Sequence, residues 1–214
     1  MAGGKAMSRK RKAGKRSVKP VMRIFTEGEK TEINYVRGYI HSYLRSRGYI
    51  AQDIVVEQPN DTSPYGLLEA AQRERLSGDL AWIVFDCDQH SGKTETFRDA
   101  ATSNVKIAYS SISFETWILL HFSYSTHAYR SCDELVKKLD KYFTHGYEKA
   151  LNNLFEETTG PYHARLQTAI ANAKRMNREI QKVNIGRPIF ELNPYTNVHE
   201  LLEAIDKFIK DNHF

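Results

Sequence analysis

The stretch LAWIVFDCDQH, residues 80–90, decides the fold of this chain. Its first six residues are apolar without interruption, which is typical of a strand buried on both faces in the middle of a parallel sheet. The run ends in Asp86 and Asp88, and in an extended segment this spacing directs both carboxylates to the same face. The stretch therefore predicts a central strand with an acidic pair at its carboxyl end.

The segments on either side predict an alternation of strands and helices. Strands are expected at residues 21–26, 54–57 and 105–110, and helices from residue 31 onward and at 64–77, 93–103 and 113–122. Strands and helices that alternate at this spacing indicate βαβ units and a parallel sheet. The sequence therefore predicts one α/β domain over residues 21–125.

The remaining part of the chain, residues 126–214, has helical periodicity. Helices are expected at residues 132–143, 147–156, 162–183 and 197–212, with a turn at 193–197 before the last of them. This part is therefore predicted to form a mainly helical C-terminal lobe that packs on the α/β domain.

The basic character of the chain is confined to its first 20 residues. The whole chain has a formal net charge of +5, yet residues 1–20 hold eight Lys and Arg and no acid, which leaves 23 basic and 26 acidic side chains elsewhere. Residues 1–20 are expected to form a disordered basic tail, which is either a solubilising extension or an arm that contacts phosphates. The folded part does not have the composition of a basic nucleic-acid clamp.

Composition also points to a compartment. The two cysteines, Cys87 and Cys132, give neither a disulfide framework nor a zinc-ligand pair, which fits a reducing cytoplasm. No segment approaches the roughly 20 apolar residues that a membrane helix needs. The basic amino terminus lacks the apolar stretch of a secretory signal. A cytoplasmic protein without a membrane segment is expected, and its oligomeric state stays open.

A third acid is expected to join the acidic pair. Glu27 follows the first strand as Asp86 and Asp88 follow the central one, and the carboxyl ends of parallel strands meet at one edge of a sheet. Crowded carboxylates repel one another, and a hard divalent cation such as Mg²⁺ is the usual compensation. Glu27 is expected either to bind a metal or to act as a general acid or base towards a reacting oxygen.

Four other residues are candidates for the same site. Glu115 begins an apolar helix after a strand end and is expected to reach the acidic edge. Glu32 and Lys30 lie at the start of the helix that follows Glu27, where an acid is also favoured by the helix dipole alone. Glu32, Lys30 and His90 are expected around the metal ligands or against the substrate.

Together these segments resemble a known family. RIFTEGEKTEINYV (23–36), AWIVFDCDQH (81–90), SISFETWILLHF (111–122) and NPYTNVHELL (193–202) are similar to the RloB-like family of Toprim-related proteins, which are associated with bacterial restriction and phage-defence loci. The resemblance implies a Toprim-like (Rossmann-like) parallel sheet flanked by helices, with a C-terminal helical extension. By position, it implies that Glu27 is the catalytic glutamate and that Asp86 and Asp88 are the metal-binding catalytic aspartates. Glu115 falls in a Phe–Glu–x–Trp signature and is implied as a further metal ligand.

The resemblance also implies an activity, namely a Mg²⁺-dependent nuclease of antiviral defence, with Mn²⁺ as a substitute metal and RNA or DNA as substrate. Two other interpretations stay open. One is a non-catalytic sensor or module that binds another protein of the defence system. The other is a phosphotransferase with the same acidic edge, although the sequence lacks a glycine-rich phosphate loop.

Overall fold

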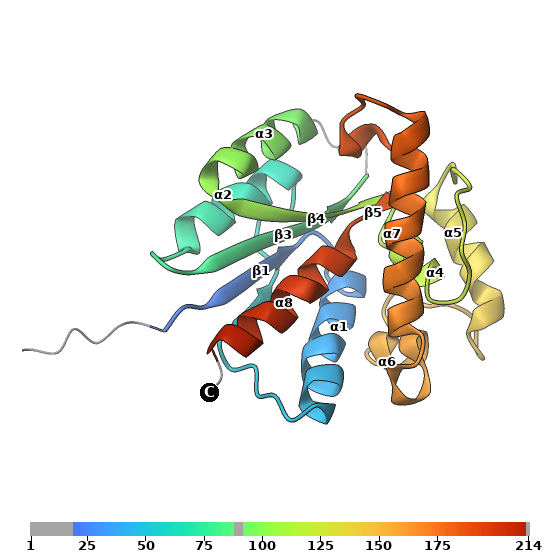
Figure 1. The fold of residues 1–214 in the computed structure, drawn as a ribbon, viewed down its shortest axis with the longest axis horizontal. Helices are drawn as coiled ribbons and strands as arrows, with labels where there is room; N and C mark the ends of the chain where they lie inside the picture. Colours follow the sequence, from blue (N-terminus) through green and yellow to red (C-terminus); the bar gives the residue numbers. More distant parts are fainter. Residues whose placement is uncertain (1–18, 88–91, 213–214) are drawn as a thin grey trace, which may run out of the picture.

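The computed structural model describes residues 19–87 and 92–212 and is built around one sheet (Figure 1). Within these residues the sheet has five strands in the order β2-β1-β3-β4-β5. The first four strands are mutually parallel, whereas β5 pairs antiparallel with β4. The strands are β1 Met22–Thr26, β2 Ile54–Glu57, β3 Leu80–Asp86, β4 Val105–Ser111 and β5 Tyr195–Thr196. The predicted α/β class and the four predicted strands are confirmed.

The central place of β3 follows from its apolar sequence. It lies between β1 and β4, in a register that pairs Ile83 with Phe25 on one side and with Ile107 on the other. Ile83 is fully buried, and its neighbours Val84 and Phe85 are each 1% exposed. Branched and aromatic side chains fit such a doubly covered strand, so the longest apolar run occupies the middle of the sheet.

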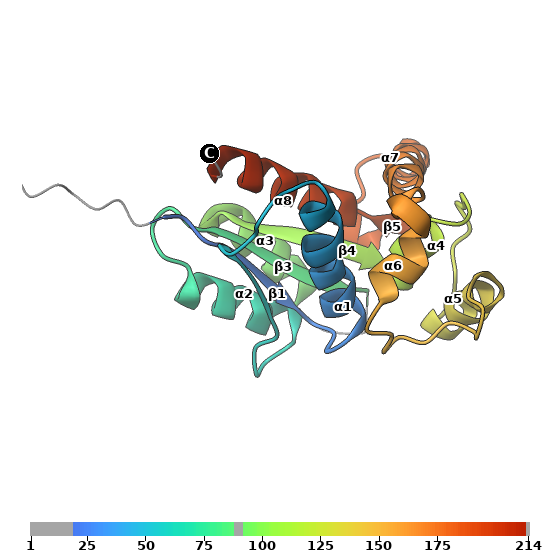
Figure 2. The same cartoon turned by 90° about the horizontal axis from the view of Figure 1, so that it is seen from below.

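Helices cover both faces of the sheet (Figures 1 and 2). One face carries α1 and the last helix, α8, and the opposite face carries α2 and α3. Their bounds are α1 Thr31–Gly38, which continues as the π-helix Tyr39–Leu44, α2 Pro64–Glu74, α3 Lys93–Ser103 and α8 Val198–Asn212. Helices on alternate faces are the outcome of right-handed crossovers between parallel strands.

The other helices gather beyond the carboxyl ends of the parallel strands (Figures 1 and 2). They are α4 Glu115–Leu119, α5 Cys132–Leu139, α6 Leu154–Thr159 and α7 Leu166–Val183, with 3₁₀ turns at Asp140–Tyr142, Pro161–His163 and Ile189–Glu191. Among the described residues, no helix has the length and apolarity needed to cross a membrane.

One predicted helix, at residues 147–156, is wrong. Residues 147–153 form no helix, and α6 begins only at Leu154. Tyr147 is 6% exposed and donates a hydrogen bond to Glu115, more than 30 positions earlier in the chain. This long-range contact overrides the local helical tendency, which is a weak preference in any sequence.

The C-terminal part also contributes to the sheet, which the sequence did not predict. Residues 195–196 form β5 where a turn was expected, and Asn197 follows at the start of α8. The side chain of Asn197 accepts a hydrogen bond from the main-chain N–H of Tyr109 (2.7 Å) and donates one to the carbonyl of Ile107 (3.0 Å). The end of the chain is therefore attached directly to β4.

Candidate functional site

A cavity of about 380 Å³ lies at the carboxyl ends of β1 and β3. It is lined chiefly by charged side chains, with five acids and two lysines among the described residues. The lining residues are Glu27, Gly28, Glu29, Lys30, Thr31, Glu32, Asp86, Phe114, Glu115 and Lys149. Five of the residues expected in one site thus share one cavity, namely Glu27, Lys30, Glu32, Asp86 and Glu115.

Glu27 and Asp86 come together because they end neighbouring parallel strands. The main-chain N–H of Glu27 donates to the carbonyl of Val84 (2.9 Å), which continues the strand pairing by one residue. The carboxylate of Glu27 in turn accepts a hydrogen bond at Oε2 from the main-chain N–H of Asp86 (3.1 Å). Gln58 also donates to the carbonyl of Glu27 (2.7 Å), so the backbone at this edge is fixed from both sides.

Glu32 brings a further carboxylate into the cavity from the first turn of α1. Its side chain lies against Gly28, and a Cβ at that position would come within 1.8 Å of its Oε2, so the close approach needs glycine or a movement of Glu32. Burial raises the pKa of Glu32 from 4.5 to about 7, and the charges of Glu115 and Glu27 add to this effect. The pKa of Glu32 is therefore raised chiefly by removal of its carboxyl group from water, with a smaller contribution from the neighbouring acids.

Glu115 is held by three groups that come from one later segment, residues 132–149. The carboxylate is 3% exposed and accepts hydrogen bonds from Tyr147 Oη at Oε1 (3.1 Å) and from Cys132 Sγ at Oε2 (3.3 Å). The ammonium of Lys149 lies 3.7 Å from Oε1. The C-terminal part of the chain thus fixes the orientation of this acid.

Lys149 reaches the cavity because its loop is anchored to α1. Thr31 Oγ1 donates to the carbonyl of Lys149 (3.1 Å), and Asn34 Nδ2 donates to the carbonyl of Leu151 (2.9 Å). Partial burial alone would lower the pKa of the Lys149 ammonium, but its contact with Cys132 (2.9 Å) and the charge of Glu115 outweigh it and raise that pKa. Lys149 is therefore a stable positive charge among the carboxylates.

The donor set of the cavity fits a hard divalent cation. Its five acids offer carboxylate oxygens, the ligands that Mg²⁺ prefers, and they outnumber the two lysines of the lining. No group of three His, Cys, Asp or Glu side chains within residues 19–87 and 92–212 has the geometry of a preformed metal centre. Asp88 and His90 were also predicted at this edge, and both lie outside the described residues.

Sequence reasoning missed three residues of the site, Cys132, Tyr147 and Lys149. All three contact Glu115 from positions at least 17 residues further along the chain. Residues 147–149 were expected in a helix, and no motif in the sequence connects them with Glu115. His121, which follows α4, lies in the core and not in the site. It pairs with Tyr35 Oη (2.9 Å), and burial lowers its pKa to about 3.

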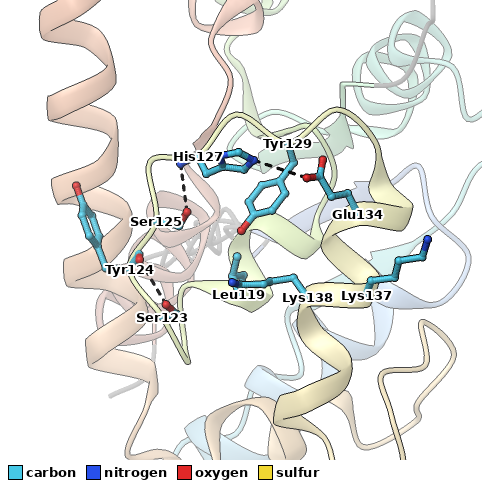
Figure 3. A pocket seen from close by; sticks show the side chains of 9 residues that line it. All are labelled: Leu119, Ser123, Tyr124, Ser125, His127, Tyr129, Glu134, Lys137 and Lys138. Atoms are coloured by element: carbon cyan, nitrogen blue, oxygen red, sulfur yellow. Dashed lines mark hydrogen bonds and ion pairs between the residues drawn. The ribbon is translucent and has the colours of Figure 1, made fainter.

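A second hollow, of about 530 Å³, lies between the loop after α4 and helix α5 (Figure 3). Its lining is mixed: His127 pairs with Glu134 (3.6 Å) and stands edge-on to Tyr129, while Lys137 and Lys138 line the α5 side. Tyr124 points away from this hollow in Figure 3 and donates to Glu179 (2.5 Å). The acidic edge of the sheet is therefore the stronger candidate for chemistry.

Among the comparisons with known proteins, the one with family models finds a match. No curated protein and no solved structure matches the chain. A family model described as RloB-like protein matches residues 22–205, which include the sheet, the acidic cavity and most of the C-terminal part. The chain therefore belongs to the RloB-like family.

Proposed function

We propose that this protein is a Mg²⁺-dependent nuclease with a Toprim-like fold, which hydrolyses phosphodiester bonds of RNA or DNA in cytoplasmic defence against phage. The observation that carries the proposal is the convergence of Glu27 and Asp86, from neighbouring parallel strands, on one acidic cavity. Membership of the RloB-like family supports it. Mn²⁺ is expected to substitute for Mg²⁺ because both prefer oxygen ligands.

Glu27 and Asp86 are the carboxylates that would hold the cation, together with Asp88 and with Glu115, which lines the same cavity. When bound, the cation supplies positive charge that stabilises the phosphodiester oxygens. The hydrogen bond from the main chain of Asp86 keeps the Glu27 carboxylate in one orientation while a substrate enters. Tyr147 lies beside the cavity, but it is buried and donates to Glu115, so direct attack by water is the simpler reaction.

The decisive experiment compares the wild type with Glu27→Gln and Asp86→Asn, and also with Asp88→Asn, on panels of tRNA, mRNA and DNA in Mg²⁺ or Mn²⁺. Each of the first two variants is expected to lose at least about 100-fold in cleavage rate, because general acid–base or metal-ligand residues typically contribute that much. EDTA is expected to abolish cleavage by the wild type.

Asp211→Asn is the matched control, since Asp211 is an exposed acid near the end of α8. It is expected to cleave at the wild-type rate. Cleavage that persists unchanged in both Glu27→Gln and Asp86→Asn would contradict the proposed mechanism.

A non-catalytic module that binds another defence protein is the second candidate. It is favoured by the charge of the chain beyond residue 20, where 26 acids outnumber 23 bases and offer little general attraction for nucleic acid. Binding of a partner protein that survives in Glu27→Gln, with no turnover of any nucleic acid by the wild type, would favour this candidate over the nuclease.

A further inference from the structure

Lys149 occupies an unusual place for a lysine, because it lines a cavity in which five acids face only two lysines. The Nζ atom is 3.7 Å from Glu115 Oε1 and 2.9 Å from Cys132 Sγ. Glu115 is almost fully buried, whereas the Lys149 side chain is 54% exposed. The lysine therefore approaches a fixed carboxylate from the open side of the cavity.

The position of Lys149 is set by its main chain and not by its charge. The carbonyl of Lys149 accepts from Thr31, and the carbonyl of Leu151 accepts from Asn34. Both donors belong to α1, which begins directly after the acidic turn Glu27–Lys30. The ammonium can consequently move on its flexible side chain while the loop stays in place.

A divalent cation and the Lys149 ammonium would compete for the negative charge of the same carboxylates. Lys149 interacts electrostatically with Glu115, Asp86 and Glu32, which are acids of the same cavity. A cation at these carboxylates would repel the ammonium, since like charges within a few ångströms disfavour each other. An ammonium released from Glu115 stays tethered at the rim, where an anionic substrate must enter.

We infer that Lys149 is the resident counter-cation of this cavity: it neutralises the carboxylates in the metal-free protein, and a divalent cation displaces it from Glu115 to bind a phosphate oxygen of the substrate. The inference rests on the proposed cation site and deepens it. It assigns Lys149, supplied by the C-terminal part of the chain, as a residue that positions the phosphate.

Titration calorimetry with Mn²⁺ alone tests the competition in the full-length protein. Lys149→Met keeps the length of the side chain and removes its charge, so it is expected to bind Mn²⁺ about fivefold more tightly than the wild type. Lys149→Arg is expected to stay within about twofold of the wild type, because it keeps the positive charge. Thermal unfolding of each variant shows whether its fold is intact.

Lys210→Met is the matched control. Lys210 is exposed near the end of α8 and does not line the cavity, so its removal is expected to change the Mn²⁺ affinity by less than about twofold. An equal gain in Lys210→Met and Lys149→Met would indicate a general charge effect and overturn the assignment.

A second measurement separates binding from chemistry. On a cleavable single-stranded oligonucleotide at saturating Mn²⁺, Lys149→Met is expected to raise KM about tenfold and to change kcat less. Unchanged Mn²⁺ affinity and KM in Lys149→Met would overturn the role of Lys149 while leaving the nuclease intact. Absence of Mn²⁺ binding in the wild type would overturn the cation site and the role of Lys149 together.

Discussion

At the scale of single residues, Glu32 couples stability to pH. Its pKa is about 7 in the folded protein and near 4.5 when unfolded, so the folded state holds the proton more tightly. The resulting stabilisation is complete below about pH 4.5 and is lost as the pH rises through about 7, up to about 3 kcal/mol in all. In urea unfolding with EDTA, the wild type is expected to lose this free energy between pH 5 and pH 8.

Glu32→Gln provides the control for this prediction, because glutamine has a similar shape and does not titrate. All other titrating groups are shared by the two proteins, so the difference between their pH profiles isolates Glu32. Parallel profiles for the two proteins would contradict the raised pKa. Mg²⁺ is expected to flatten the wild-type profile if the cavity binds it.

The residues of the site differ in how far they could be predicted. Glu27 and Asp86 could be predicted because each ends an apolar run, and parallel strands bring such ends together. Glu115 could be predicted only as a candidate for the same site, because it begins a helix after a strand end and does not itself end a strand. Lys149 could not be predicted, because its position depends on main-chain hydrogen bonds to Thr31 and Asn34, which leave no pattern in the sequence.

At the scale of elements, α1 packs against α6 at a point where only glycine fits. A Cβ at Gly38 would lie 2.4 Å from the Cβ of Phe155, so a larger residue must push the two helices apart. Gly38→Ala is expected to destabilise the protein by about 1–2 kcal/mol, because overpacking outweighs the gain in helix propensity. Chemical denaturation measures the change.

His41→Ala is the control for the helix itself, since His41 is exposed in the π-helical continuation of α1. It is expected to change the free energy of unfolding by no more than about 0.5 kcal/mol. A Gly38→Ala variant as stable as the wild type would show that the two helices can separate without cost.

The elements with a strong local sequence pattern were predicted more accurately than those without one. The buried strands and α3 were located within one residue at each end, because continuous apolar runs and helical spacing are strong local signals. Strand β5 has two residues, Tyr195 and Thr196, and exists only through its pairing with β4. A strand this short carries no pattern of its own, so the turn predicted there was the natural local interpretation.

At the scale of the whole molecule, the C-terminal part is joined to the sheet and to the acidic cavity. It supplies β5, which pairs with the carboxyl end of β4, it supplies α8, and it provides the contacts to Glu115. The sequence predicted a helical lobe packed on the domain but could not predict these attachments, because each joins residues that are far apart in the chain. The site consequently needs both parts of the chain to be folded.

Asn197→Ala tests this dependence. Asn197 is 5% exposed and bonds the main chain of β4 at Tyr109 and Ile107, so its removal leaves buried polar groups unpaired and is expected to cost about 2–4 kcal/mol. Tryptophan fluorescence reports on the part before residue 126, because both tryptophans, Trp82 and Trp117, lie there. Far-UV circular dichroism reports on the helices of both parts. In urea, fluorescence and circular dichroism are expected to shift together to one lower midpoint, because the two parts unfold as a unit.

The matched control is Asn212→Ala, which loses a hydrogen bond within α8 and is expected to shift the midpoint far less. Two separate transitions in Asn197→Ala would instead mean that the C-terminal part folds independently of the sheet.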